Sequence, residues 1–297
     1  MTVVDAHQHV WDPAQRAYGW MAAPGLEPLR RPFGVSDLRA AIAATPVERT
    51  VLVQAVPALE ETRELLAAAA GSGGLIAGVV GWVDLAADVE RALAELRAGP
   101  GGELLVGIRH QAEDERDPEW LPRPDVLRGL AAVERAGLVY DLLVRPPQLP
   151  AAARAVRELP GLRFVLDHGG KPPIASGGLD GWRALIAELA DAPNVVCKLS
   201  GLVTEAERNE DVVPVAGELL EAFGPDRLMY GSDWPVCTLK ARYGEVFALA
   251  EAVLPPAARD RVLGGVATEV YGLRQIGGLS AAEPDARHPM NATDHRL

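Results

Sequence analysis

The chain begins with TVVDAHQHV (residues 2–10), an apolar run that ends in two histidines separated by one residue. Seven more short runs rich in Val, Ile and Leu follow, and several are continuously apolar instead of alternating with polar residues. Strands buried on both faces of a parallel sheet have this composition. The runs lie at residues 2–10, 49–56, 75–83, 104–111, 137–144, 162–170, 194–202 and 226–235. They predict eight parallel strands.

Between these runs, apolar residues recur with the period of an amphipathic helix. The predicted helices lie at residues 36–45, 59–70, 86–98, 124–137, 148–159, 179–191, 211–224 and 244–254. From the second strand onward, the strands start 25 to 33 residues apart. This regular alternation predicts an α/β fold, a (β/α)8 TIM barrel that forms a single domain over residues 1–274. A doubly wound open sheet is the alternative, but it often carries a Gly-rich phosphate turn after its first strand, where this chain has His-Gln-His.

The composition limits the classes of partner and the location. The chain has 41 acidic and 29 basic residues, a net charge of −12, which argues against binding to nucleic acid or to an anionic membrane. Asp5 and His7 interrupt the first apolar run, so no signal peptide is expected, and no stretch of ~18 apolar residues predicts a membrane span. Cys197 and Cys237 lack zinc-site spacing and are expected to be reduced, buried thiols. We expect a cytoplasmic protein, with a homo-oligomer left open.

Two segments depart from the regular alternation. Residues 11–35 form a long link after the first strand, and long loops at the carboxyl ends of barrel strands commonly cover a site. We therefore expect this link to lie over the mouth of the barrel. Residues 275–297 are polar and without periodicity, and they are predicted to form a disordered tail.

Polar residues end the apolar runs, where a plain strand would continue with Val or Ile. In a (β/α)8 barrel the carboxyl ends of all strands meet at one mouth. Charged side chains are costly to bury, so a ring of them at this mouth is expected to form a site. These strand-end residues are His7, His9, Gln54, Arg109, His110, Asp141, Asp167, His168, Lys198, Ser200, Ser232 and Asp233.

The two N-terminal histidines indicate a metal site. Residues i and i+2 of a strand point to the same face, so His7 and His9 are expected to aim together into the mouth. With His168 and Asp233 they make a set of nitrogen and carboxylate ligands, which suits zinc or manganese better than calcium or magnesium. The alternative is a pair of exposed histidines near the chain terminus that bind no metal.

Five motifs occur in a characteristic order: DAHQHVWDP (5–13), GIRHQ (107–111), FVLDHGGKPP (164–173), VVCKLSGL (195–202) and YGSDWPV (230–236). Together they resemble the amidohydrolase superfamily, in its TIM-barrel branch of metal-dependent hydrolases. Within that branch they are most similar to sugar-lactone hydrolases, such as L-fuconolactone and L-rhamnonolactone hydrolases. The resemblance spans about residues 2 to 273.

The resemblance implies that His7, His9 and His168 ligate one divalent metal ion, with zinc as the expected metal. Asp233 would contact the same ion and act as the catalytic carboxylate, with His168 also at the reacting centre. A binuclear centre is not expected, because the fourth and fifth strands lack the usual ligands of two-metal members. Some members of this branch work without a tightly held metal, so the metal requirement is left open. Val266 stands where the family usually has Asn, which is expected to alter a helix start.

Lactone opening needs an activated water, a polarised carbonyl group and a proton for the leaving oxygen. We expect Asp233 to accept the water proton and later to deliver it to the ring oxygen. Arg109 is a fixed group with several N–H donors, suited to ring oxygens or a carboxylate. The expected substrate contacts come from Gln54, Trp82, Arg109, His110, Lys171 and Trp234.

Several strand-end residues have structural alternatives. Arg109 could pair with Asp141 or Asp167 in a purely structural role. Asp167 is expected to orient His168 or to cap a backbone group. Lys198 is open between an ion pair and a contact to the ligand.

The sequence therefore predicts a hydrolase that opens a sugar-acid lactone, with the particular lactone left open. One alternative is the non-oxidative decarboxylation of an aromatic or muconate-type acid on the same barrel, since such relatives share the His-x-His pair, the sixth-strand His and the eighth-strand Asp. A second alternative is a non-catalytic barrel that binds a ligand. Ser200 and Ser232 lack a G-x-S-x-G context, which argues against a serine hydrolase.

Overall fold

In the computed structural model, which describes residues 2–274, eight parallel strands form one sheet whose spatial order follows the sequence. The strands are β1 (Val3–Gln8), β2 (Val47–Val53), β3 (Ile76–Gly81), β4 (Leu105–His110), β5 (Val139–Leu142), β6 (Phe164–Leu166), β7 (Val195–Leu199) and β8 (Leu228–Tyr230). The sheet closes on itself where Gln8 of β1 forms a parallel bridge with Trp234, just after β8. This closure confirms the predicted (β/α)8 TIM barrel.

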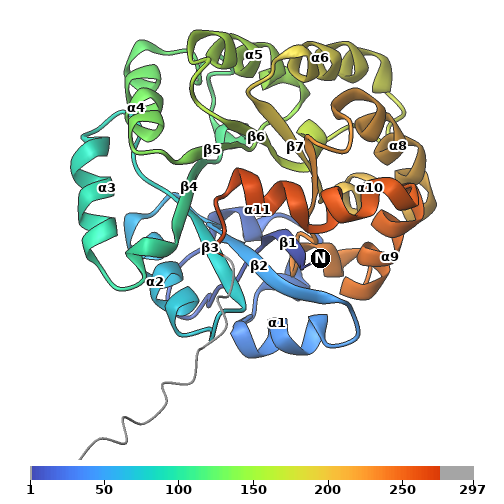
Figure 1. Ribbon diagram of the computed structural model, residues 1–297, viewed down its shortest axis with the longest axis horizontal. Helices are drawn as coiled ribbons and strands as arrows, with labels where there is room; N and C mark the ends of the chain where they lie inside the picture. Colours follow the sequence, from blue (N-terminus) through green and yellow to red (C-terminus); the bar gives the residue numbers. More distant parts are fainter. Residues whose placement is uncertain (1, 275–297) are drawn as a thin grey trace, which may run out of the picture.

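Helices surround the barrel (Figure 1). Eight of them match the predicted helices to within a few residues at each end, and α2 (Leu59–Ala70) and α6 (Leu179–Asp191) have the predicted bounds. The other six are α1 (Val35–Ile42), α3 (Val89–Ala98), α4 (Pro124–Arg135), α5 (Leu149–Glu158), α8 (Val212–Phe223) and α9 (Tyr243–Val253). The sequence pattern did not predict the short helices α7 (Leu202–Glu205), α10 (Pro256–Asp260) and α11 (Val266–Val270).

The inside of the barrel is filled mainly by valine and alanine. Val51, Val165 and Val196, from β2, β6 and β7, are buried in one cluster. Val266 and Tyr271, from α11 and the residues after it, belong to the same cluster, and Figure 1 shows α11 lying across this end of the barrel. Val266 is thus the first residue of α11 and packs against the barrel interior.

A register shift in β1 turns two consecutive side chains toward the barrel interior. The pairing of β1 with β2 shifts between Asp5 and Gln8. Ala6 packs in the interior valine cluster, and His7 also contacts charged side chains inside the barrel. Asp5 instead reaches Tyr243 of the outer helix α9. Strand irregularities of this kind re-aim side chains next to active sites.

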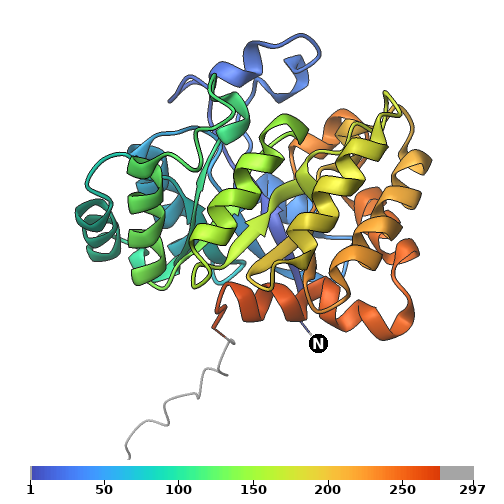
Figure 2. The same ribbon diagram turned by 90° about the horizontal axis from the view of Figure 1, so that it is seen from above.

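The long link after β1 lies over the carboxyl end of the barrel. The Trp11 indole N–H donates to the Leu29 carbonyl at 3.1 Å, and the Trp20 indole N–H donates to the Ala55 carbonyl at 2.9 Å. Figure 2 shows this blue segment at the end of the barrel opposite to α10 and α11. The link therefore has the position expected of a covering loop.

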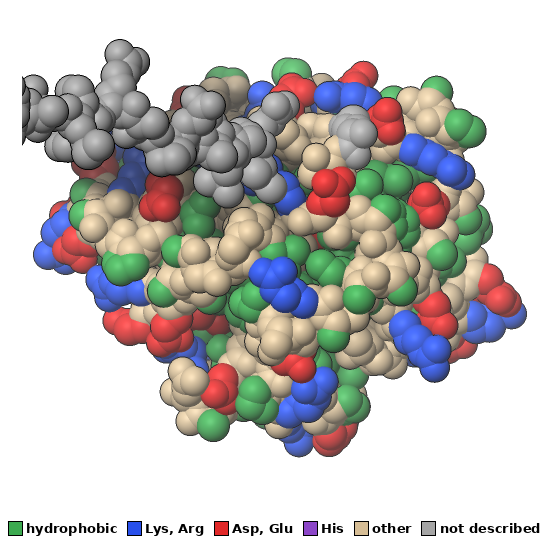
Figure 3. Space-filling view, turned by 60° about the horizontal axis from the view of Figure 1, so that its bottom comes forward, with side chains coloured by type: hydrophobic (Ala, Val, Ile, Leu, Met, Phe, Trp, Pro, Cys, Tyr) green, Lys and Arg blue, Asp and Glu red, His purple; other side chains and the backbone are tan. Residues whose placement is uncertain are grey.

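Other sequence predictions concern the cysteines, the surface and the tail. Cys197 and Cys237 are free and buried, as predicted. Within residues 2–274, every helix falls short of the length or the hydropathy that a membrane span requires. On the face shown in Figure 3, basic and acidic side chains are interspersed around the rim. The tail predicted over residues 275–297 lies outside the described residues.

Gly129→Ala in α4 is expected to destabilise the fold, because the added methyl group would collide with the Leu85 carbonyl oxygen. Forcing an extra carbon against a fixed neighbour costs about 1–3 kcal/mol. Gly217→Ala in α8 is the matched control, since a methyl group there meets nothing within 4 Å, and removing a helix-interior glycine stabilises by roughly 0.5–1 kcal/mol. Urea unfolding measures both variants, and a Gly129→Ala protein as stable as wild type would contradict the packing.

Candidate active site

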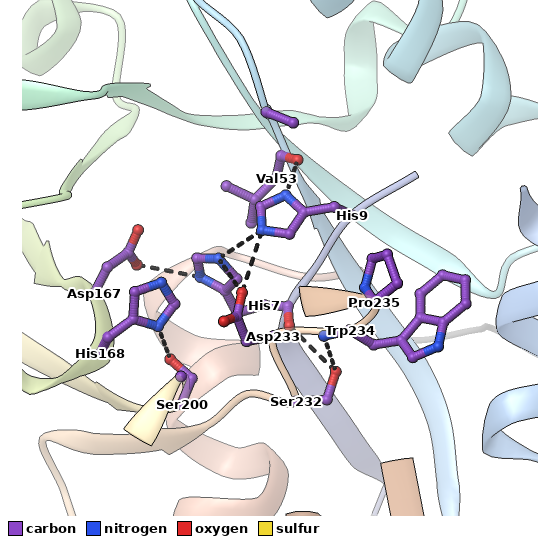
Figure 4. Close-up of polar contacts among 12 residues, drawn as sticks. His7, His9, Val53, Asp167, His168, Ser200, Ser232, Asp233, Trp234 and Pro235 are labelled. Carbon is purple, nitrogen blue, oxygen red and sulfur yellow. Dashed lines mark hydrogen bonds and ion pairs between the residues drawn. The ribbon is translucent and has the colours of Figure 1, made fainter. Parts of the chain in front are cut away.

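Four side chains from three strand ends meet at the carboxyl mouth of the barrel (Figure 4). His7 Nε2 lies 3.1 Å from His9 Nε2, and Asp233 Oδ1 lies 3.7 Å and 3.4 Å from these two nitrogens. His168, which follows β6, forms a cluster with His7 and Asp233 in which one ligand atom of each lies within 4.8 Å of the others. The barrel thus brings together all four residues that were predicted as metal ligands.

In two of the cluster histidines, His9 and His168, a hydrogen bond at Nδ1 orients the imidazole ring. His9 Nδ1 lies 2.8 Å from the Val53 carbonyl oxygen, so Nδ1–H donates and Nε2 keeps its lone pair. His168 Nδ1 contacts Ser200 Oγ at 2.8 Å. Outer contacts of this kind commonly orient histidines that bind metals.

The spacing of the donor atoms fits a single metal ion. Bonds of about 2.0–2.1 Å at tetrahedral angles separate neighbouring ligand atoms by about 3.3 Å. The nitrogens of His7 and His9 and the oxygen of Asp233 lie 3.1 to 3.7 Å apart. This donor set, with His168 beside it, could hold one divalent metal ion.

A buried carboxylate ties the first strand to the last. Asp5 Oδ1 accepts hydrogen bonds from the backbone N–H groups of His7 at 3.0 Å and Ser232 at 2.8 Å. Asp5 Oδ2 accepts from the hydroxyls of Ser232 at 2.6 Å and Tyr243 at 2.8 Å. The Asp233 N–H also donates to the His7 carbonyl at 2.8 Å. These bonds hold His7 and Asp233 side by side, although the sequence pattern did not mark Asp5 as a site residue.

Three residues around the mouth have a left-handed backbone. The φ angles of His168, Lys171 and Asp233 are 56°, 50° and 57°, in a region that residues other than glycine seldom adopt. Within residues 2–274, no other non-glycine residue has a positive φ. Such conformations persist where the surrounding structure enforces them, and they cluster at active sites. The backbone thus sets the direction of two cluster residues and of Lys171 nearby.

Charged side chains form a buried network beside the histidines. Lys198 Nζ lies 2.5 Å from Asp141 Oδ2 and 3.0 Å from Asp167 Oδ1. Arg109 Nη1 lies 2.9 Å from Asp167 Oδ2. Asp167 Oδ1 also lies 3.3 Å from His7 Nδ1, instead of forming the expected bond to the neighbouring histidine. Arg109 and Lys198 therefore form the ion pairs that were considered as structural alternatives, and the network supports the ring of His7.

Burial and neighbouring groups set the protonation states of the cluster. Burial lowers the pKa of His168 to about 4 and lowers the pKa of His7 well below its usual value. Both rings are therefore neutral at pH 7 and keep the lone pair that metal binding requires. Burial alone would raise the pKa of Asp233, but the imidazoles of His168 and His9 hold it below its usual range. Asp233 is therefore ionised at neutral pH.

A cavity of about 740 Å³ opens at this cluster, within the size range of small-molecule sites. Trp11 and Trp20 of the covering loop form part of its wall. The residues predicted for the site that line this cavity are His9, Arg109, His168, Lys171 and Asp233. His7 lies behind them, fully buried.

Two predicted substrate contacts, Gln54 and Trp234, do not line the cavity. Gln54 is fully buried, and its amide donates to the Arg109 carbonyl at 3.2 Å. Trp234 is also buried and packs edge-on against Phe33 at a ring distance of 5.5 Å. Both side chains support the mouth from outside the cavity.

Trp82 and His110, two more predicted contacts, lie against each other and do not line this cavity. The Trp82 indole N–H donates to His110 Nδ1 at 3.0 Å, and His110 Nε2 lies 2.8 Å from Glu115 Oε1. Trp120 stacks on the His110 ring at 4.1 Å. His110 lines a separate hollow of about 360 Å³.

The cavity wall also contains charged residues that the sequence pattern did not mark, namely Glu113, Arg145 and Glu205. The Lys171 ammonium donates to Glu113 at 2.8 Å, and Arg145 Nε lies 3.1 Å from the same carboxylate. Glu205, at the end of α7, lines the same cavity. These residues belong to loops beyond the strand ends, where no periodicity indicates the direction of a side chain.

A family model described as Amidohydrolase matches residues 4–273. The chain belongs to the amidohydrolase family. It is 40% identical over 291 residues to an L-fucono-1,5-lactonase of Burkholderia ambifaria, with 94% of this chain and 99% of the relative covered. It is 41% identical to an L-fucono-1,5-lactonase of Burkholderia multivorans, with coverage of 91% and 96%.

Solved structures agree with this membership. An amidohydrolase from Burkholderia multivorans, crystallised with bound Zn, matches with a TM-score of 0.85 and 40% identity over 92% of this chain and 100% of that chain. A solved 5-carboxyvanillate decarboxylase shares only 14% identity at a TM-score of 0.64, which shows a common fold alone. The comparisons therefore give this amidohydrolase no particular likeness to decarboxylases.

Lys198→Met is expected to destabilise the protein by about 3–5 kcal/mol, because it leaves the buried Asp141 and Asp167 carboxylates without their shared cation. Arg183→Met is the matched control, since Arg183 pairs with Glu218 on the exposed surface and should contribute far less to stability. Chemical unfolding at pH 7 measures both. Equal losses of stability in the two variants would argue against the buried network.

Proposed function

We propose that this amidohydrolase opens a sugar-acid lactone, such as an L-fucono- or L-rhamnonolactone, by attack of an activated water on the lactone carbonyl. The observation that carries the proposal is the cluster of His7, His9, His168 and Asp233 at a cavity of about 740 Å³. A cavity of this size suits one small ligand. The two near full-length relatives described as L-fucono-1,5-lactonases support the substrate class.

Zinc is the proposed cofactor, held by His7, His9, His168 and Asp233. Imidazole nitrogens with one carboxylate oxygen suit zinc better than calcium or magnesium. The Burkholderia multivorans amidohydrolase with bound Zn supports this choice. When bound, the ion would polarise the lactone carbonyl and lower the pKa of a water molecule.

Asp233 is the proposed acceptor of the water proton. It lines the cavity and is ionised at neutral pH, because neighbouring imidazoles hold its pKa below the usual range. Its backbone N–H is bonded to the His7 carbonyl, so the carboxylate is held against the histidines before any substrate binds. A base held in this way can take a proton from water without first being reoriented.

The charges of the cavity wall favour a neutral, polyhydroxylated substrate. Lys171 and Arg145 both pair with Glu113, and Arg109 pairs with Asp167. Along the described wall, every lysine and arginine therefore already has an acidic partner. A substrate with free carboxylates would find no unpaired cation there. This disfavours the alternative reaction on aromatic or muconate-type acids.

Asp233→Asn is expected to lower kcat/KM for L-fucono-1,5-lactone by about 10²–10⁴-fold, because the amide cannot accept the water proton. The rate is followed with a pH indicator that reports the acid released. Asp191→Asn, an exposed residue at the carboxyl end of α6, is the matched control and should keep the wild-type rate. Turnover at the wild-type rate by Asp233→Asn would contradict the proposal that Asp233 accepts the water proton.

Removal of metal is expected to slow lactone opening, and added zinc should restore it. Metal analysis of the purified protein should find one zinc per chain. His9→Gln is expected to lower this content, because it removes a ligand of the cluster, whereas His110→Gln should retain it, because His110 lies outside the cluster. A zinc-free protein whose activity is unaffected by a chelator would refute the cofactor assignment.

A further inference from the structure

The covering loop after β1 is fastened to itself near its two ends. The backbone groups of Trp11 and Phe33 exchange two hydrogen bonds, of 3.0 and 2.9 Å. Phe33 also packs edge-on against Trp234 at a ring distance of 5.5 Å, so this bridge is anchored to the residue that follows Asp233. Between the bridged residues lie residues 12–32, which we call the lid. The bridge gives the lid a fixed base.

Bonds between its own residues hold the lid together. Its two short helices, η1 (Gly19–Ala22) and η2 (Glu27–Leu29), contact each other. The Arg30 guanidinium donates from Nε to the Met21 carbonyl at 2.8 Å and from Nη2 to the Ala23 carbonyl at 3.2 Å. Figure 2 shows the lid within the blue segment that stands out beyond the strand ends. A loop bonded to itself in this way can move as one body while its internal bonds stay intact.

Two polar contacts join the lid to the barrel on the side of β2. The Trp20 indole N–H donates to the Ala55 carbonyl, in the loop after β2, at 2.9 Å. Arg16 Nη2 lies 2.8 Å from Glu64 Oε1 on α2, where more than half of the Glu64 side chain is exposed. An exposed ion pair contributes little to stability, and a single hydrogen bond contributes only slightly more. These two contacts therefore break more easily than the paired backbone bonds and packed rings at the base.

The lid forms part of the cavity wall and restricts access to the metal-ligand cluster. Four of its residues line the cavity, namely Gly19, Trp20, Ala23 and Leu26. The cluster residues that line the same cavity are only 4–5% exposed; they are His9, His168 and Asp233. A ligand as large as a sugar must reach these side chains and leave again in each turnover. Movable loops over an active site commonly provide this exchange.

We propose that the lid opens as one body about the bridge between Trp11 and Phe33, with Trp20 as its latch, and so admits ligands to the cavity. In the closed arrangement the Trp20 indole binds the Ala55 carbonyl and forms part of the wall. Opening breaks both contacts to the β2 side, while the bonds inside the lid and at its base persist. The inference goes beyond the proposed lactonase reaction, because it concerns access to the cavity for any ligand.

Hydrogen exchange at the indole N–H groups tests the lid in the wild-type protein. Opening exposes the Trp20 N–H to water, whereas the Trp11 N–H stays bonded to the Leu29 carbonyl. Trp82 is the matched control, because it is also half-buried and its indole N–H donates to His110 Nδ1 outside the lid. We expect the Trp20 N–H to exchange at least about tenfold faster than those of Trp11 and Trp82. NMR measures the rates, and single substitutions of tryptophan by phenylalanine assign the signals.

Either of two results of this measurement would overturn the proposal. Equal exchange rates for Trp20 and Trp82 would mean that the wall stays closed at the latch. Equally fast exchange of Trp20 and Trp11 would mean that the loop unfolds locally instead of moving as one body about its base.

A reversible cross-link tests whether turnover requires opening. Arg16→Cys and Glu64→Cys, introduced together, can be joined by a short reagent that dithiothreitol cleaves, and the two native cysteines escape it because they are buried. We expect the cross-link to lower kcat for L-fucono-1,5-lactone at least about tenfold, with recovery after cleavage. Glu64→Cys alone is the matched control and should turn over at the same rate before and after treatment.

The two experiments separate the lid from the proposed reaction. Unchanged turnover by the cross-linked protein would overturn the role of the lid in ligand access. A wild-type protein that opens no sugar-acid lactone would overturn the proposed function, but the indole exchange rates would still decide whether the lid opens.

Discussion

The closure of the barrel by the Asp5 carboxylate is the constraint on which the site depends. Asp5 accepts four hydrogen bonds, from the backbone and hydroxyl of Ser232, the backbone of His7 and the hydroxyl of Tyr243. A buried carboxylate with this many donors is well satisfied, whereas the loss of any donor would leave a costly unpaired group. The first and last strands are therefore held in one relative position, and His7 and Asp233 with them.

The interior of the barrel is layered between α11 and the cavity. Next to α11 lies the valine and alanine cluster, and beyond it the charged layer of Lys198, Asp141, Asp167 and Arg109. Such charges can remain buried because each is paired, and Tyr271, which follows α11, also donates to Asp141 at 2.9 Å. The imidazole cluster rests on this layer and faces the cavity. Rigid support of this kind holds catalytic side chains in place without the help of substrate.

Much of this arrangement could be predicted from the sequence, and the exceptions have physical reasons. The sequence indicated the four metal-ligand candidates because each of them ends an apolar run, and the barrel brings them together. They are His7, His9, His168 and Asp233. Gln54 also ends such a run, yet it follows the inward-facing Val53 and so turns to the opposite face of β2, away from the cavity. The short helices α7, α10 and α11 have too few residues to show a period. Cytoplasmic location and a homo-oligomer stay predictions.

The sequence by itself determined the number, the order and the parallel direction of the strands, because these follow from local apolar periodicity and from the helices between the runs. Only the tertiary structure decided which side chains enter the cavity. Strict alternation would put Asp5 and His7 on one face, but the register shift against β2 turns Asp5 outward and His7 inward. Register is set by hydrogen bonds to a neighbouring strand about forty residues away. The direction of loop residues such as Glu113 and Glu205 likewise depends on packing between loops, which no local pattern records.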